Sequence, residues 1–71
     1  NPKAPIHLLV ITKEHVANLN EIEDEKLMSE IFKGIKAVCK KMNIAEYKTV
    51  INTGKSAGQE VFHFHAHILA Q

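Results

Sequence analysis

Three histidines alternate with apolar residues across residues 62–69 (FHFHAHIL). Alternate side chains of a β-strand point to opposite faces. A strand over residues 61–70 would therefore place the histidines on one face and four apolar side chains on the other: Phe62, Phe64, Ala66 and Ile68. We expect the apolar face to join the core and the histidine row to face a cleft or solvent. Buried imidazoles need hydrogen-bond partners, so three in a row mark a candidate functional site.

The rest of the chain predicts two more strands and one helix. Residues 7–11 (HLLVI) form a short apolar run typical of a buried strand, and residues 47–53 (YKTVINT) are rich in the β-branched residues that strands favour. Between them, five apolar residues recur at steps of three and four, the period of one helical face: Leu27, Ile31, Ile35, Val38 and Met42. The predicted order is therefore strand, helix, strand, loop, strand.

Local residue choices predict where the helix begins and ends. Asn20 and Glu23 have the three-residue spacing of a capping box, which predicts a start near Asn20. Asn43 tolerates the left-handed conformation that closes many helices. Three more apolar residues widen the helical face: Met28, Phe32 and Cys39. That width fits a helix deep in a core, or one with a sheet on one side and a partner subunit on the other.

Size and charge exclude several classes of protein. Seventy-one residues allow one domain, taken as residues 1–71, and no apolar run approaches the roughly 20 residues that cross a bilayer. Nine Lys and Arg against eight Asp and Glu give a formal charge of +1, too balanced for a main partner that is nucleic acid or an acidic membrane. No signal peptide is visible and the single Cys39 cannot form an internal disulfide, so a cytoplasmic location is expected.

Three chemistries could use the histidine row. Neutral imidazole binds zinc, but a straight strand at roughly 3.3 Å per residue puts the Cα atoms of His63 and His67 about 13 Å apart, so a metal would need other ligands. Histidine can also move protons near neutral pH. Finally, a neutral ring nitrogen can attack phosphorus and form a covalent intermediate that water removes, provided that an acceptor holds the other nitrogen as N–H.

The loop before the histidines, residues 52–60 (NTGKSAGQE), contains two glycines, a lysine and several small polar side chains. Glycine lets backbone N–H groups approach an anion closely, which favours a phosphate-binding loop. A plain turn between two antiparallel strands explains the same composition and is the simpler interpretation.

Taken together, these segments resemble the histidine triad family. Residues 63–69 (HFHAHIL) fit the pattern His-φ-His-φ-His-φ-φ, where φ is apolar, and Gly58-Gln59 lies upstream at the spacing that the family uses. Residues 52–54 (NTG) resemble the segment ending the preceding strand. Residues 5–15 (PIHLLVITKEH) resemble the family's Pro-x-His-x-Leu-Val-Ile-Pro-Lys-x-His stretch, with Thr12 in place of proline. The resemblance covers essentially the whole chain and looks closest to the branch of small nucleoside phosphoramidate and dinucleotide hydrolases.

The resemblance implies an α+β fold with an antiparallel sheet and one main helix, present here as a partial domain. It also implies a homodimer formed through helix and strand contacts. The implied activity is that of a nucleotide hydrolase or transferase, which cleaves at the α-phosphate of nucleoside phosphoramidates or related purine nucleotide conjugates. The implied reaction requires no cofactor, and no metal ligand is assigned within this chain.

The resemblance further assigns roles to individual residues. His65 would be the nucleophile that forms a nucleotidyl-histidine, the backbone carbonyl of His63 would hold the His65 ring N–H, and His67 would contact phosphate and assist the leaving group. Gln59 and the backbone of residues 58–60 would line the phosphate site. The full set of implied substrate-site residues is Asn52, Gly58, Gln59, Glu60 and His7, the last supporting the cluster from the neighbouring strand.

Three departures from the family pattern bear on function. Glu60 stands where many members carry Ser or Thr, and a carboxylate beside a phosphate is repulsive, so the leaving-group preference stays open. The chain begins after the position of the family's N-terminal hairpin and helix and ends before its usual tail, so we expect a fragment, and zinc is possible in the native-length protein. Two alternatives remain, a nucleotide-binding module with little turnover and a histidine-based metal site.

Overall fold

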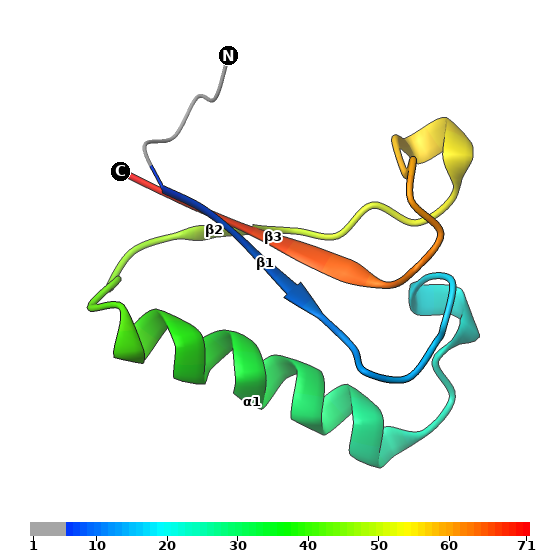
Figure 1. The fold of residues 1–71 in the computed structure, drawn as a ribbon, viewed down its shortest axis with the longest axis horizontal. Coiled ribbons are helices and arrows are strands. Elements are labelled where there is room, and N and C mark those ends of the chain that lie inside the picture. The colour runs from blue at the N-terminus through cyan, green and yellow to red at the C-terminus, as the bar shows by residue number, and fades with distance from the viewer. Residues whose placement is uncertain (1–5) are drawn as a thin grey trace.

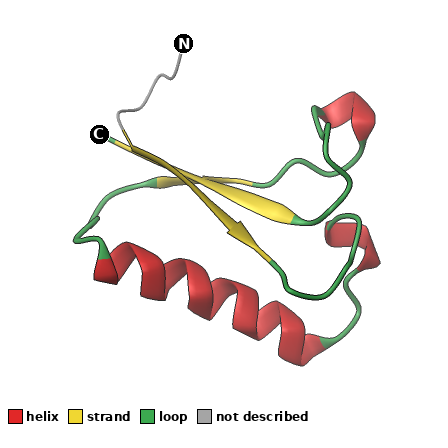
Figure 2. Cartoon of the chain, in the orientation of Figure 1, coloured by secondary structure: helices red, strands yellow, loops and turns green. Residues whose placement is uncertain are grey.

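The computed structural model describes residues 6–71, which form a three-stranded antiparallel sheet with one long helix against one face (Figure 1). The elements in chain order are β1 (Ile6–Ile11), the 3-10 helix η1 (Leu19–Glu21), α1 (Glu25–Lys41), β2 (Lys48–Val50), the 3-10 helix η2 (Lys55–Ala57) and β3 (His65–Ala70). The sheet order β1-β3-β2 places the last strand of the sequence between the other two (Figure 2). The expected α+β architecture is confirmed. Pro5, the first residue of the family-like stretch of residues 5–15, lies outside the described residues.

Burial along β3 alternates residue by residue, as the sequence pattern predicts. Phe64, Ala66 and Ile68 are at most 2% exposed and belong to the same core cluster as Ile31 and Ile35 of α1. The three intervening histidines are only partly buried. The helix therefore covers the apolar face of the sheet, and the histidines lie on the opposite face.

The third strand begins at His65, so the prediction of a strand over residues 61–70 with Phe62 on the core face is wrong. Phe62 is 49% exposed. Because β1 ends opposite His65 and β2 ends opposite His67, no strand within residues 6–71 reaches the residues before His65. The backbone N–H of Phe64 donates instead to the Val16 carbonyl at 2.7 Å, which directs this part of the chain away from the sheet.

The second strand is also shorter than predicted, covering Lys48–Val50 rather than residues 47–53. Beyond Val50 the chain enters a loop, and Asn52 donates its side-chain N–H to the Ala57 carbonyl within that loop at 2.9 Å. Local bonds from an asparagine side chain to the backbone compete with strand pairing. The β-branched composition therefore predicts the strand but overestimates its length.

The helix begins at Glu25 rather than near Asn20, because Asp24 is the residue that caps it. The Asp24 carboxylate accepts a hydrogen bond from a first-turn N–H at 3.0 Å. Asn20 lies within η1, which the side chain of Asn18 caps. The left-handed conformation expected at Asn43 is confirmed by its φ of 59°.

The apolar face of α1 includes two of the three residues expected to widen it, Met28 and Cys39. Ile31, Ile35 and Cys39 are buried, whereas Phe32 and Met42 are 52% and 53% exposed. Leu27, Met28 and Val38 also pack against the core, so its contact with the helix is broad, and Phe32 lies exposed beside it. No helix within residues 6–71 has the length and apolar character needed to cross a membrane.

The two candidate caps can be separated by mutation. We expect Asp24→Ala to lower the free energy of unfolding by about 1 kcal/mol, because a first-turn N–H loses its acceptor. Asn20→Ala, the matched control, should change it by less than about 0.5 kcal/mol, since Asn20 is exposed and caps nothing. Urea unfolding of the complete protein followed by circular dichroism measures both. Equal losses for the two variants would contradict the observed helix start.

Candidate active site

The sheet face opposite α1 carries histidines from two strands. His65 and His67 come from β3, and His7 comes from β1, where it pairs with Leu69 and so shares their face. The His7 Nε2 and His67 Nδ1 atoms are 2.9 Å apart. The ring centroids of His65 and His67 are 5.0 Å apart. These three imidazoles therefore form a continuous row across two strands.

A backbone carbonyl holds His65. Its Nδ1 lies 2.8 Å from the His63 carbonyl oxygen. A carbonyl oxygen only accepts hydrogen bonds, so Nδ1 carries the proton and, in the neutral ring, Nε2 keeps its lone pair. This is the hydrogen bond that the family resemblance implies, and it leaves His65 with one nucleophilic nitrogen.

The ring of His63 is anchored in turn to the end of β1. Its Nε2 lies 2.8 Å from the Thr12 carbonyl oxygen, so Nε2 is the protonated nitrogen of this ring. The Thr12 hydroxyl donates to the Glu14 carbonyl at 2.8 Å and so braces the turn that presents the acceptor. The ring of His15 packs edge-on against His63, with centroids 5.3 Å apart. The Thr12 carbonyl thus orients the ring of His63, and the His63 carbonyl orients the ring of His65.

The close packing of the row disfavours charge on its middle member, His67. Burial lowers the pKa of His67 from the usual 6.5, and the charges that His65 and His7 can carry lower it further. His67 therefore stays neutral at a pH where a free imidazole would take up a proton. Because the unfolded chain takes up that proton first, the free energy of unfolding falls as the pH drops through 6.5, and it levels off below the lowered pKa of the folded state.

Gln59 organises the loop before the histidines, and its side chain is 2% exposed. Its Oε1 accepts hydrogen bonds from the Gly54 N–H at 2.8 Å and from Asn18 Nδ2 at 3.4 Å. Its Nε2 donates to the carbonyls of Ala17 and Val61 at 2.6 and 3.0 Å. A carboxamide offers two donors and about two acceptor positions, so the side chain is fully used inside the protein. The Gln59 side chain therefore keeps no free donor for the ligand contact that the resemblance implies.

Two glycines give this loop its backbone path. Gly54 and Gly58 have φ of 92° and 98°, a region that strains residues with a Cβ. The N–H groups of Gly58 and Gln59 donate to carbonyls within the loop. Among the residues that the structure describes, nothing accepts the N–H of Glu60, whose side chain is exposed. The backbone N–H of Glu60 is therefore the free donor in the part of the loop predicted to bind phosphate.

The predicted site residues divide into two groups. His7, His63, His65 and His67 are joined by the contacts described above. The remaining four belong to the loop: Asn52, Gly58, Gln59 and Glu60. Val50 pairs with His67, so the chain that leaves β2 toward the loop runs beside the start of β3. The sheet therefore directs the loop toward the His65 end of the row.

Sequence analysis missed two contributors, the Thr12 carbonyl and the Asn18 amide. Each acts on a residue far along the chain, Thr12 on His63 and Asn18 on Gln59. The threonine at the family's proline position was the one available signal for Thr12. No local pattern marks Asn18.

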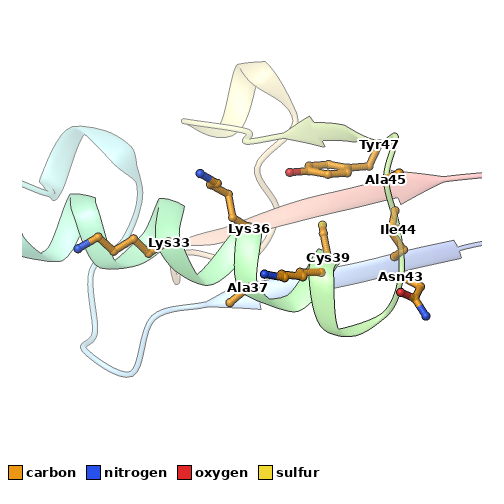
Figure 3. A pocket seen from close by; sticks show the side chains of 9 residues that line it. Lys33, Lys36, Ala37, Cys39, Asn43, Ile44, Ala45 and Tyr47 are labelled. Atoms are coloured by element: carbon orange, nitrogen blue, oxygen red, sulfur yellow. The ribbon is translucent and has the colours of Figure 1, made fainter.

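A hollow of about 610 Å³ lies away from the histidines, between the C-terminal half of α1 and residues 43–47 (Figure 3). Lys33, Lys36 and Lys40 line it together with Tyr47, and none of the predicted site residues does. The candidate active site is therefore defined by its histidines and the adjoining loop rather than by this hollow.

Metal binding gains no support from this part of the chain. No group of three or more His, Cys, Asp or Glu side chains within residues 6–71 is placed to hold a metal ion. The histidine rings are engaged with carbonyl oxygens and with one another instead.

The fold and the site together define a class of protein. Members of this class are α+β proteins with a row of histidines on one face of an antiparallel sheet and a glycine-containing loop beside it. The model of the HIT domain, the histidine triad domain, matches residues 1–71. A HIT-like protein of Synechococcus elongatus is 44% identical over 71 residues, which cover 96% of this chain and 62% of that protein. One from Helicobacter pylori is 47% identical over 72 residues, covering 99% and 68%. The chain belongs to the HIT domain family and spans about two thirds of the length of these relatives.

Solved structures share the fold. One described as a HIT-like protein matches all of this chain and 71% of its own, with 44% identity and a TM-score of 0.91. A HIT family hydrolase from Legionella pneumophila matches with 37% identity and a TM-score of 0.86, covering 97% of this chain and 65% of its own. The diadenosine triphosphate hydrolase of Plasmodium falciparum matches with 26% identity and a TM-score of 0.72, covering 100% and 50%. The chain therefore has a fold found in proteins described as hydrolases.

The contact between His7 and His67 can be tested by titration. We expect His7→Gln to raise the pKa of His67, because it removes one of the charges that oppose protonation there. The value should stay below 6.5, since burial and His65 still act. NMR titration of the His67 Cε1–H signal measures the change.

His15→Gln is the matched control for that titration. His15 packs against His63 rather than His67, so the pKa of His67 should not move. A downward shift in His7→Gln, or equal shifts in both variants, would show that His7 does not act through its charge.

Proposed function

We propose that the complete protein is a nucleotide hydrolase or transferase that acts at the α-phosphate of purine nucleoside phosphoramidates or related conjugates. The observation that carries the proposal is the hydrogen bond from His65 Nδ1 to the His63 carbonyl. It keeps the lone pair of His65 on Nε2, which is what nucleophilic attack on phosphorus requires.

The proposed reaction has two steps. The Nε2 lone pair of His65 attacks the α-phosphorus, a phosphorus–nitrogen bond forms, and the bond from phosphorus to the leaving group breaks. The leaving group departs with the electron pair of that bond and takes up a proton from water, while His67 assists by a hydrogen bond to the departing group. Water then attacks phosphorus and releases a proton to the solvent, the bond to Nε2 breaks, and its electron pair returns to the ring, giving the nucleoside monophosphate.

The loop of residues 52–60, called the phosphate loop below, would hold the phosphate. The N–H of Glu60, which follows Gln59 and has no acceptor among the described residues, would donate to a phosphate oxygen, and Gly58 and Asn52 shape the backbone around it. A side chain on Gly58 would come within 3.4 Å of the Asn52 amide and would strain a φ of 98°, so this path depends on glycine. The Glu60 carboxylate would disfavour anionic leaving groups, which supports neutral amines as leaving groups.

The known relatives support the substrate class. A neighbour with this fold is described as a diadenosine triphosphate hydrolase and another as a HIT family hydrolase, which favours a nucleotide substrate and a hydrolytic reaction. The proposed reaction uses imidazole and water and needs no cofactor. We also propose a cytoplasmic location, in keeping with the single cysteine of the chain and its buried thiol.

The proposed intermediate can be trapped. Adenosine phosphoramidate is mixed with the complete protein, the reaction is quenched early, and intact mass is measured alongside AMP release. We expect an added adenylate in the wild type and none in His65→Ala, with turnover falling on the order of a thousandfold or more. His15→Ala, which removes an exposed histidine that makes no hydrogen bond among the described residues, should keep the adduct.

A folded wild-type protein that binds AMP but forms no adduct and releases no AMP would replace this proposal with the nucleotide-binding module. Turnover without an adduct that survives in His65→Ala would remove His65 as the nucleophile.

We further propose that the protein is a homodimer that uses an exposed stripe of α1 centred on Phe32. By their three- and four-residue spacing, Glu25, Phe32, Lys36 and Lys40 lie along one stripe of this helix. Phe32 is 52% exposed near the middle of the stripe. A second copy packed antiparallel would bury Phe32 against its counterpart and bring Glu25 beside Lys40 of the other chain. This self-complementary pattern is what a twofold interface needs.

Sedimentation velocity tests the dimer. We expect Phe32→Asp to weaken self-association at least tenfold, because it places a charge at the centre of the apolar contact. Leu19→Asp, a similar change at a residue that is 40% exposed outside α1, should leave the association unchanged. A wild type that sediments as a monomer, or equal weakening by both variants, would reject this interface.

A further inference from the structure

The side chain of Asn18 links the segment before α1 to the phosphate loop. Its Oδ1 accepts the N–H of Asn20 at 3.0 Å and so caps η1. Its Nδ2 donates to Oε1 of the buried Gln59 at 3.4 Å. One small amide therefore bonds a local turn and a residue far along the chain.

The partners of Gln59 fix the orientation of its amide. Turning the carboxamide over would place Oε1 against the carbonyl oxygens of Ala17 and Val61, and would place the NH₂ group against the N–H of Gly54. Each of these pairs would leave a buried polar group without a partner. Gln59 therefore has one favourable orientation, and in that orientation its oxygen faces two donors, Gly54 N–H and Asn18 Nδ2.

We propose that Asn18 is a positioning residue for the phosphate loop and sets the affinity of that loop for nucleotide. It donates to Gln59, and Gln59 in turn holds the N–H of Gly54, where the loop turns at a φ of 92°. The inference rests on the proposed function in that the loop is taken to bind phosphate. Asn18 itself touches no substrate in this arrangement and acts only through Gln59.

The substitution Asn18→Asp tests the link by exchanging one group, the side-chain NH₂ for an oxygen. Aspartate caps a helix about as well as asparagine, so the bond to the Asn20 N–H is kept. The new oxygen, however, would face Oε1 of Gln59, and Gln59 cannot turn over to relieve the repulsion. The chain offers a matched control in Asn20→Asp, which adds the same charge two residues away at an exposed side chain. Asn18→Ala removes the donor without adding a charge.

Two measurements on the complete protein follow. Without ligand, hydrogen exchange of the Gly54 amide should become at least fivefold faster in Asn18→Asp and faster to a smaller extent in Asn18→Ala, because the acceptor at Gln59 is displaced. By calorimetric titration, AMP should bind five- to tenfold more weakly to Asn18→Asp. The rate at saturating adenosine phosphoramidate should stay within about twofold, since the bond between His65 and His63 is untouched. Asn20→Asp should match the wild type in all three.

The outcomes separate this inference from the proposed function. An unchanged Gly54 exchange rate in Asn18→Asp overturns the positioning role whatever the enzyme does. Faster exchange with an AMP affinity equal to that of Asn20→Asp overturns the link to nucleotide binding. A proportionate loss of affinity, saturated rate and melting temperature would show a merely structural role. A wild type that binds no AMP removes the proposed function, and the exchange rate of Gly54 then still decides whether Asn18 positions the loop.

Discussion

The pairing of β3 on both sides is the constraint on which the rest of the structure depends. A strand with neighbours along both edges has its backbone groups committed to the ladder, so its side chains can only alternate between the two faces. One face takes Ala66 and Ile68, which are fully buried beneath α1. The other face receives His65 and His67. The alternation of side chains along β3 thus places apolar residues in the core and histidines on the opposite face. A shift of the strand register by one residue would exchange the two sets.

Backbone carbonyls then determine which ring nitrogen of His63 and of His65 carries the proton. A free histidine exchanges between two neutral forms, but a ring nitrogen placed against a carbonyl must carry the proton. The Thr12 carbonyl decides this for His63, and the His63 carbonyl decides it for His65. Carbonyl groups do not titrate, so these two assignments do not depend on a nearby charge. His67 differs because its Nδ1 faces another imidazole, that of His7, and its protonation depends on its neighbours.

Sequence periodicity predicted the elements and the face that carries the histidines, because side-chain direction follows from local geometry. The ends of the elements were harder, since they depend on which neighbour supplies a partner. Asp24 caps the helix in place of Asn20, and Phe62 is exposed because β1 stops short of it. In the site, a row of histidines is visible in the sequence, whereas the Thr12 carbonyl and the Asn18 amide act at long range. Any residue supplies a carbonyl, so its role appears only once the chain is folded.

The contacts between the histidines and β1 also bear on the register in which β1 pairs with β3. Sliding β1 along β3 by two residues would keep Leu8 and Val10 on the core face, so apolar burial alone distinguishes poorly between the two alignments. In the direction that brings His7 opposite Gln71, the slide would separate His7 from His67 and move Thr12 away from the ring of His63. In the native alignment both polar contacts are made. The residues assigned to chemistry therefore also add polar contacts that favour the native alignment over that misaligned one.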